Sequence, residues 1–287
     1  MKTLKHTLAT AVLGVTLAGC ASTTGPTGPT VISYDHGALD TLLELGLEER
    51  VLAIPHQGLP DYLSELGSRL PDAGSLKVPD LEVLEKLQPE LVLMTGRQGD
   101  AVDDVRKLAR VMQVGVTGDS FRDAVSAGVL ELAEVYGLQK AATEELAELW
   151  QHVDARQAQV ADAGTVTVVT HNDGNLSLRQ EAVVYELLNL APETVPASVQ
   201  PVVRGERTFY PVDADTLVAM APETLLVVDR SAAIGGEPLE PDTLESAFRK
   251  AGAATRVVVL DPGLWYLSGG GLQSVRLQVD EVVNAVQ

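Results

Sequence analysis

The sequence has one cysteine, no long apolar run inside the chain and about half as many basic as acidic residues. A single cysteine, Cys20, cannot form an internal disulfide, so the fold must depend on its apolar core. Lys and Arg together number 21 against 40 Asp and Glu, which gives a formal net charge of −19. A surface this acidic argues against nucleic acid and anionic membranes as partners.

Motifs that would indicate catalysis are also missing. The sequence contains no Gly-x-Ser-x-Gly elbow, no His-Glu-x-x-His pair and no glycine fingerprint of a dinucleotide site after a strand. The five histidines are scattered, whereas a bare-metal site collects several histidines and carboxylates. An enzyme and a simple metal-ion binder are therefore not expected.

The N-terminus has the layout of a secretory signal. Lys2 and Lys5 precede a short apolar stretch, residues 8–17, which is followed by the small-residue sequence "LAGC" ending at Cys20. This sequence resembles a bacterial lipoprotein signal, so we expect cleavage after residue 19 and lipid attachment at Cys20. An ordinary signal peptide with a chance cysteine is the alternative. Cleavage would remove two lysines and leave a charge of 19 − 40 = −21.

Residues 20–30 consist mainly of Gly, Pro, Ser and Thr, a composition that predicts a flexible tether. The folded part is expected to begin near Val31. The 257 residues beyond the tether are enough for two domains or for one large one.

Two segments of the chain repeat each other. The stretches "PDLEVLEKLQPELVLMTGR" (79–97) and "VDADTLVAMAPETLLVVDR" (212–230) align without a gap at an offset of 133 residues. In each, an Asp is placed to cap a two-turn helix, a Pro ends that helix, and a buried strand runs to an arginine. The matching pairs are Asp80 and Asp213, Leu84 and Leu217, Pro89 and Pro222, Glu90 and Glu223, and Arg97 and Arg230.

Strands and helices alternate in both halves, which predicts an α/β fold with mainly parallel sheets covered by helices. We assign residues 31–138 to an N-terminal lobe and residues 164–287 to a C-terminal lobe. Residues 139–163 lack proline and show helical spacing of apolar residues, so they are expected to form one long connecting helix.

The arginines that end the repeated strands are the first candidate binding residues. Ligands of open parallel sheets bind beyond the carboxyl ends of the strands. Arg97 and Arg230 occupy equivalent places in the two halves, so we expect them to converge on a cleft between the lobes. The alternative is that each is a solvated surface residue or forms an ion pair within its own lobe.

Several longer stretches resemble a known family. They are "YDHGALDTLLELGLEERVLAIP", "LPDYL", "GSLKVPDLEVLEKLQPELVLMTGRQ", "LLVVDRSAAIGGE" and "LDPGLWYLSGGGLQSV". The chain resembles class III periplasmic solute-binding proteins, which have two lobes joined by one long helix and deliver iron–siderophores, haem or cobalamin to ABC importers. Within that class it is similar to lipoproteins that bind ferric catecholate siderophores of the enterobactin and anguibactin type.

The resemblance implies a cleft lined with arginines that meets the negative charge of a ferric catecholate. Arg97 and Arg230 match two of these positions, and Arg179 is the best match to a third. Arginine suits this task because it keeps its charge, is weakly hydrated and can stack on catechol rings. The ligand would be the Fe(III)–siderophore complex itself, with no further cofactor.

The resemblance also raises the question of direct iron ligation. Tyr266 matches a tyrosine that ligates iron in some relatives, but Arg204 stands where those relatives have a histidine. Arginine cannot ligate iron, and Arg207 adds another cation nearby. We therefore expect recognition of the outer face of a coordinatively saturated complex, with Tyr266 donating a hydrogen bond or stacking. His171 could reach the cleft, and Tyr266 could instead be a core residue beside Trp265.

An ABC permease is the partner that the resemblance implies, and Glu65 and Glu186 are candidate docking residues by position. We expect a monomer in the periplasm or cell envelope, anchored through Cys20. A haem- or cobalamin-binding protein of the same class remains an alternative. A surface adhesion or scaffold lipoprotein is a further one, although it would not need the two arginines.

Overall fold

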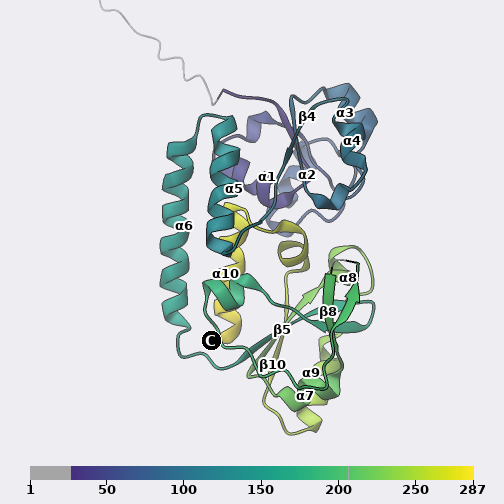
Figure 1. The fold of residues 1–287 in the computed structure, drawn as a ribbon, viewed down its shortest axis with the longest axis vertical. Helices are drawn as coiled ribbons and strands as arrows, with labels where there is room; N and C mark the ends of the chain where they lie inside the picture. The colour runs from purple at the N-terminus through teal and green to yellow at the C-terminus, as the bar shows by residue number, and fades with distance from the viewer. Residues whose placement is uncertain (1–26, 206) are drawn as a thin grey trace, which may run out of the picture.

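A computed structural model describes residues 27–205 and 207–287, which form two lobes stacked along the long axis of the molecule (Figure 1). The predicted signal sequence 1–19, Cys20 and the tether as far as residue 26 lie outside these described residues. Within the two described ranges, no helix combines the length and the apolar character needed to cross a bilayer.

Lobe one is built on a four-stranded, fully parallel sheet in the order β2-β1-β3-β4. Its strands are β1 Val31–Ser33, β2 Val51–Ala53, β3 Leu91–Met94 and β4 Arg110–Gln113. Its helices are α1 His36–Glu44, α2 Ser64–Arg69, α3 Leu81–Leu87, α4 Ala101–Val105 and α5 Phe121–Val135, with short turns η1 Glu48–Arg50, η2 Asp61–Leu63 and η3 Gly96–Gln98.

Lobe two contains a six-stranded mixed sheet in the order β10-β9-β5-β6-β8-β7, in which β10, β9 and β5 are parallel and the rest antiparallel. Its strands are β5 Val166–Asn172, β6 Asn175–Leu178, β7 Val202–Arg204, β8 Arg207–Val212, β9 Thr224–Asp229 and β10 Arg256–Leu260. Its helices are α7 Ala214–Met220, α8 Arg230–Ala233 and α9 Pro241–Lys250, with π-helical turns η4 Val183–Leu187 and η5 Leu264–Ser268.

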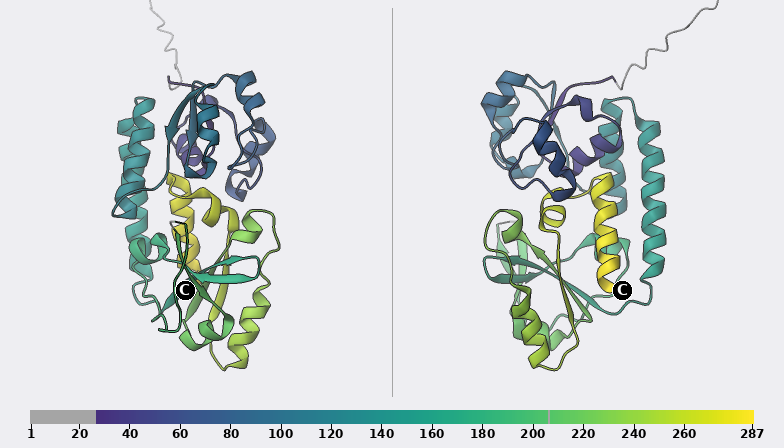
Figure 2. Two further views of the ribbon diagram at one scale, coloured as in Figure 1. Left: turned by 45° about the vertical axis from the view of Figure 1, so that its right-hand side comes forward. Right: turned by 180° about the vertical axis from the view of Figure 1, so that it is seen from behind.

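One long helix runs along one side of both lobes, and a second lies beside it from beneath lobe one down along lobe two (Figures 1 and 2). The first, α6 Gln139–Gln159, has 21 residues and is therefore about 30 Å long. It corresponds to the connecting helix expected at 139–163. The second, α10 Leu272–Val286, packs beside α6 and also against α1 of lobe one. The predicted α/β architecture with two lobes is confirmed, and the last helix reinforces the connection.

The internal repeat is visible in the hydrogen bonds of the two lobes. Asp80 accepts hydrogen bonds from the first-turn amides of α3, and Asp213 accepts one from the first turn of α7. Both helices end in a left-handed residue, Gln88 at φ 48° and Ala221 at φ 49°. The strands that follow, β3 and β9, each pair in parallel with the first strand of their lobe, β1 and β5.

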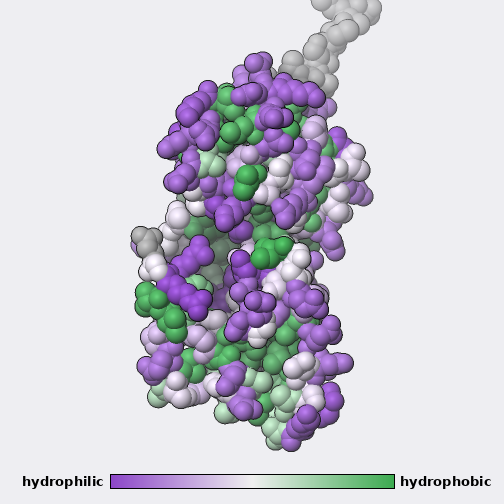
Figure 3. All heavy atoms as spheres, turned by 90° about the vertical axis from the view of Figure 1, so that its right-hand side faces the viewer, coloured by the Kyte–Doolittle hydropathy of each residue, from purple (hydrophilic) through white to green (hydrophobic). Residues whose placement is uncertain are grey.

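A single hydrophobic cluster extends through both lobes. It includes Leu39 of α1 in lobe one, Leu149 of α6, Val228 of β9 in lobe two and Val279 of α10, all fully buried. Apolar burial is the dominant favourable contribution to folding, so a shared core resists separation of the lobes along this side. On the side away from α6, a hollow separates the two lobes (Figure 3).

A buried carboxylate fixes the start of α10 beneath lobe one. Asp40 is fully buried and accepts hydrogen bonds from the backbone amides of Gln273 (3.1 Å) and Ser274 (3.0 Å) and from the hydroxyl of Tyr62 (3.0 Å). A negative charge is stabilised at a helix N-terminus, where backbone N–H groups lack partners. Gly271 permits the approach, because a Cβ there would lie 2.1 Å from the Asp40 carboxylate. We call this arrangement the Asp40 anchor.

The Asp40 anchor predicts a specific pH dependence of stability. Burial raises the pKa of Asp40 to about 7, although its hydrogen bonds act in the opposite direction. Between about pH 4 and pH 7 the folded protein therefore keeps a proton that the unfolded chain has released, so Asp40 makes the free energy of unfolding fall as the pH rises. We expect the wild type to lose stability relative to Asp40→Asn across this window, as measured by urea denaturation at a series of pH values.

The carboxyl and the amide differ in this window only if Asp40 titrates there. A difference in unfolding free energy between the two proteins that stays constant from pH 4 to pH 7 would contradict the assignment.

Candidate functional site

The two candidate arginines each lie on a short helical turn just beyond a buried parallel strand. After β3, the Thr95 side chain accepts a hydrogen bond from the Arg97 amide (3.1 Å) and caps the turn η3. After β9, the Asp229 side chain caps α8, whose first residue is Arg230. Caps of this kind orient the first turn of a helix and so fix the direction in which each arginine leaves its strand.

Arg97 of lobe one and Arg230 of lobe two meet at Tyr266. Their guanidinium carbons lie 5.6 Å and 5.5 Å from the centroid of the Tyr266 ring. Arg97 Nη2 donates to the Tyr266 carbonyl oxygen (2.9 Å), and Arg230 Nε donates to the Tyr266 hydroxyl (2.8 Å). The convergence expected from the repeat is therefore present. We call these three residues the arginine–tyrosine cluster.

Tyr266 is held in place by the buried side of η5. The neighbouring Trp265 is almost fully buried and donates from Nε1 to Glu281 Oε2 of α10 (2.6 Å). Tyr266 itself is half-buried and faces the arginines. This placement favours Tyr266 as a residue of the cleft rather than as a core residue packed beside Trp265.

A buried hydrogen-bond network is centred on Asp229, the residue that precedes Arg230. Asp229 accepts hydrogen bonds from His171 Nδ1 (2.8 Å), the Leu239 amide (2.6 Å) and the Ala232 amide (3.1 Å). Burial acts to raise the pKa of the Asp229 carboxyl, but these hydrogen bonds outweigh it and hold that pKa below its usual value. Asp229 is thus a buried anion one residue before Arg230.

His171 does not reach the cleft with a free nitrogen. It is buried, its Nδ1 bonds to Asp229, and its Nε2 accepts a hydrogen bond from the Gly174 amide (3.1 Å). Over the described residues, no group of three or more His, Cys, Asp and Glu side chains is arranged to hold a metal ion.

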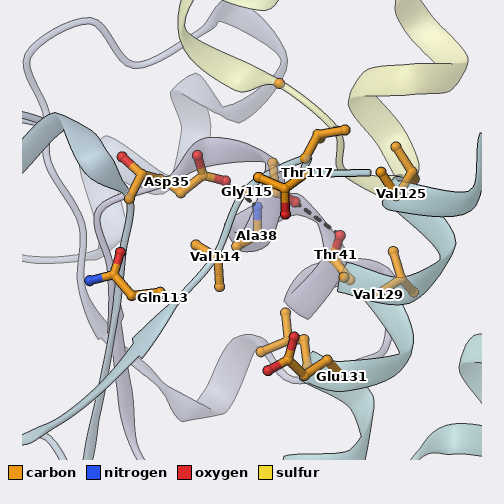
Figure 4. Close-up of a pocket in the computed structure, with 18 of the residues that line it drawn as sticks. Asp35, Ala38, Thr41, Gln113, Val114, Gly115, Thr117, Val125, Val129 and Glu131 are labelled. Carbon is orange, nitrogen blue, oxygen red and sulfur yellow. Dashed lines mark hydrogen bonds between the residues drawn. The ribbon is translucent and has the colours of Figure 1, made fainter. Parts of the chain in front are cut away.

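A pocket of about 600 Å³ opens beside the arginine–tyrosine cluster, in the hollow between the lobes (Figures 3 and 4). Most of its wall comes from the ends of β3 and β4 and from α1 and α5 of lobe one. Its polar side chains are Asp35, Thr41, Thr95, Arg97, Gln113, Thr117, Glu131 and Arg207. Burial raises the pKa of Asp35 to about 6, partly offset by the Ala38 amide and by Arg97.

The remaining candidate arginines lie outside the cluster. Arg179 forms an ion pair with Glu181, and no contact with the arginine–tyrosine cluster is recorded for it within the described residues. Arg204 is exposed on β7, and Arg207, at the start of β8, is exposed and reaches the rim of the pocket. The sequence therefore located two arginines of the cluster; of the other two candidates, Arg179 is paired with Glu181 and Arg204 is exposed on β7.

The two candidate docking glutamates differ in their surroundings. Glu65 is exposed in the first turn of α2 on lobe one. Glu186 is exposed on η4, but its Oε2 accepts a hydrogen bond from the Phe121 amide at the start of α5 (3.0 Å). One oxygen of Glu186 is thus occupied within the protein.

Sequence reasoning missed Asn172 and the lobe-one pocket. Asn172 Oδ1 accepts a hydrogen bond from Arg230 Nη1, and Asn172 ends β5 at the same sheet edge as Asp229. The rule that ligands bind at strand ends could have indicated Asn172, because it follows a buried strand. Nothing in the sequence indicated that Gln113 and Glu131 line one cavity, since only the tertiary fold brings them together.

The fold and the cleft define a two-lobed extracytoplasmic binding protein. The sequence model described as "Periplasmic binding protein" matches residues 31–264, and the chain belongs to this family. It is accordingly a substrate-binding protein of an ABC importer and not an enzyme.

Individual relatives are similar over most of the chain. The petrobactin-binding protein YclQ of Bacillus subtilis is 28% identical over 268 residues, covering 90% of this chain and 82% of YclQ. Its crystal structure superimposes with a TM-score of 0.79 at 26% identity, covering 91% and 93% of the two chains. The ferric-anguibactin-binding protein FatB of Vibrio anguillarum is 24% identical, with 90% and 82% covered. A periplasmic heme binding protein from Pseudomonas aeruginosa shares the fold at 19% identity, with a TM-score of 0.67 and 90% and 92% covered.

The network around Asp229 yields a prediction for stability. In Asp229→Asn, the side-chain amide would replace the oxygen that accepts from the Leu239 amide, so two donors would face each other. An unsatisfied buried donor costs about 1–3 kcal/mol, and we expect the free energy of unfolding to fall by that amount in urea denaturation.

Asp162→Asn is the matched control, because Asp162 is exposed before β5 and its replacement should change stability by less than about 0.5 kcal/mol. Equal stability of the two variants would show that the Asp229 network does not support the turn that carries Arg230.

Proposed function

We propose that this chain binds a ferric siderophore of the catecholate type between its lobes and delivers it to an ABC permease. The observation that carries the proposal is the convergence of Arg97 and Arg230, from different lobes, on the half-buried Tyr266. In a chain with a net charge of −19, two guanidinium groups directed at one ring form a conspicuous local cation site. An anionic ligand with aromatic rings would neutralise the two guanidinium groups and could also stack on the Tyr266 ring.

Recognition through the outer face of the complex fits the residues best. Arg204, at the position where some relatives have a histidine, cannot supply a ligand atom to iron, and both nitrogens of His171 are engaged. Tyr266 would then contact the siderophore rather than iron. Arg179 and Arg204 would add charge around the cluster, and Arg179 would have to share its guanidinium with Glu181.

Haem is the second candidate ligand. The Tyr266 hydroxyl faces Arg230 and accepts a hydrogen bond from its Nε, and a tyrosine oxygen would suit an axial ligand to haem iron. The resemblance to relatives whose names include petrobactin and anguibactin favours the siderophore.

Delivery requires attachment and docking. Lipid attachment at Cys20 would keep the protein at the membrane, and residues 20–30 would act as the tether. Glu65 and Glu186 would meet basic residues of the permease, with Glu65 the more available of the two because one Glu186 oxygen is already bonded.

Ligand titration tests the proposed function. The chain from Ser22 onward is titrated with the ferric complexes of a hexadentate tris-catecholate, a tetradentate bis-catecholate and a tris-hydroxamate, and with haem, while tryptophan fluorescence and visible spectra are recorded. We expect tight binding of the tris-catecholate complex with an unchanged charge-transfer band. Arg97→Gln and Arg230→Gln should each weaken it roughly tenfold or more, as expected for a lost charge-assisted hydrogen bond.

The spectra separate the alternatives. A shifted charge-transfer band with the tetradentate complex would mean that the protein ligates iron. A shifted Soret band without binding of any ferric catecholate would move the assignment to haem.

A further inference from the structure

A small hydrophobic cluster joins the two lobes beside Tyr266. It consists of Leu76 from a loop of lobe one, Ala233 of α8 and Leu267 of η5, all buried, and Tyr266 packs against it. This cluster is separate from the large hydrophobic cluster that extends through both lobes. We call Leu76, Ala233 and Leu267 the interlobe latch. None of the three lines the pocket beside the arginine–tyrosine cluster.

On the side of lobe two, the interlobe latch is continuous with the arginine–tyrosine cluster. Leu267 directly follows Tyr266 on η5. Ala233 ends α8, the four-residue helix that begins at Arg230. Four residues make about one helical turn, which moves as a unit, so a displacement of Ala233 would also displace Arg230.

On the side of lobe one, the buried side chain of Gln98 ties Leu76 to the turn that carries Arg97. Gln98 follows Arg97 on η3. Its Oε1 accepts a hydrogen bond from the Thr95 amide (2.7 Å), and its Nε2 donates to the carbonyl oxygens of Leu76 and, at 3.3 Å, of Tyr34. Breaking these bonds would leave buried polar groups unsatisfied, which is costly. A shift of Leu76 would therefore disturb η3.

A glycine of lobe one makes room for the latch. Gly58 lies in the loop between β2 and η2 and has a φ of 75°, which favours glycine. A Cβ at this position would lie 2.7 Å from Leu267 Cδ1 and 3.4 Å from the Ala233 carbonyl oxygen. The two lobes therefore approach each other closely at the latch.

We propose that Leu76 and Gln98 are positioning residues, which set the spacing of the two cluster arginines through the interlobe latch without contacting the ligand. A site shared by two lobes binds in proportion to the fraction of molecules that have the binding-competent spacing. The latch would keep that fraction high. This inference rests on the proposed function, and it assigns part of the affinity for the siderophore complex to an apolar contact outside the pocket.

A positioning role and a direct contact with the ligand differ in their kinetic effect. Loss of the latch lowers the fraction of molecules that can bind, so it mainly slows association. Loss of a direct contact, as in Arg97→Gln, mainly accelerates dissociation. The two rate constants therefore distinguish a residue that positions the arginines from one that touches the ligand.

The first test measures stopped-flow binding of a ferric tris-catecholate complex to variants of the chain from Ser22 onward. Leu76→Ala truncates the latch, Leu76→Val truncates it less, and Leu76→Met keeps its volume. Leu87→Ala is the control, because Leu87 is a partly buried leucine that packs against a cluster formed by lobe-one residues. We expect Leu76→Ala to bind about tenfold more weakly, as for a competent fraction of about one tenth, mainly through slower association. Leu76→Val should show the same effect to a smaller degree, and Leu76→Met and Leu87→Ala should bind like the wild type.

The second measurement needs no ligand. The chain from Ser22 onward has no cysteine, so spin labels can be attached at two introduced cysteines. Glu85→Cys on α3 of lobe one and Lys250→Cys on α9 of lobe two are suitable, because both residues are exposed and the two helices lie in different lobes (Figure 1). Electron spin resonance should give one narrow distance distribution with an intact latch and in Leu87→Ala. In Leu76→Ala the distribution should be broader.

Two results would overturn the latch proposal and leave the proposed function intact. One is a distance distribution that is equally narrow in Leu76→Ala and Leu87→Ala. The other is a loss of affinity in Leu76→Ala that lies entirely in faster dissociation. Absence of binding of any ferric siderophore by the wild-type protein would overturn the proposed function and the positioning role together.

Discussion

The structure depends on the path that the chain takes from β10 in lobe two back to lobe one. The Asp40 anchor holds the first turn of α10 beneath α1, through hydrogen bonds to the amides of Gln273 and Ser274. Residues 261–271 must therefore pass between the lobes, and η5 lies on that passage. Tyr266 sits between Arg97 and Arg230 for this reason. Asp40, which does not line the described pocket, thus helps to decide where the aromatic residue of the cleft is placed.

The arginine–tyrosine cluster concentrates positive charge in one place within an acidic protein. The two arginines of the cluster come from different lobes, and each is positioned by a local capping side chain. Asp229 fixes the turn that carries Arg230, and Thr95 fixes the turn that carries Arg97. The acidic remainder of the surface would disfavour general anion binding, so charge is concentrated where the lobes face each other. The shared core along α6 and α10 restricts how far the lobes can separate and is consistent with a site that is largely formed in advance.

Much of the fold was predictable because it is built from local signals. The aspartate caps at Asp80 and Asp213, the prolines that follow each helix and the buried strands all have short-range causes, and the structure shows them in both lobes. The convergence of Arg97 and Arg230 between the lobes was predictable from the repeat combined with the rule that ligands bind at strand ends. Three features were not predictable, because each depends on contacts between residues far apart in the sequence. They are the hydrogen bond from Arg230 to Asn172, the pocket lined by β4 and α5, and the burial of His171.

The sequence by itself determined the two α/β lobes, the long connecting helix and the arginines at the strand ends, because capping, helix termination and hydrophobic periodicity act over a few residues. Only the tertiary structure decided what surrounds those arginines. It separated Arg179, paired with Glu181, from the cluster, and it brought Arg207 of β8 to a pocket of the other lobe. These outcomes follow from the return of the last helix to lobe one and from the position of the β7–β8 pair at the edge of the lobe-two sheet. Both are set by long-range packing and strand register, which local sequence patterns do not encode.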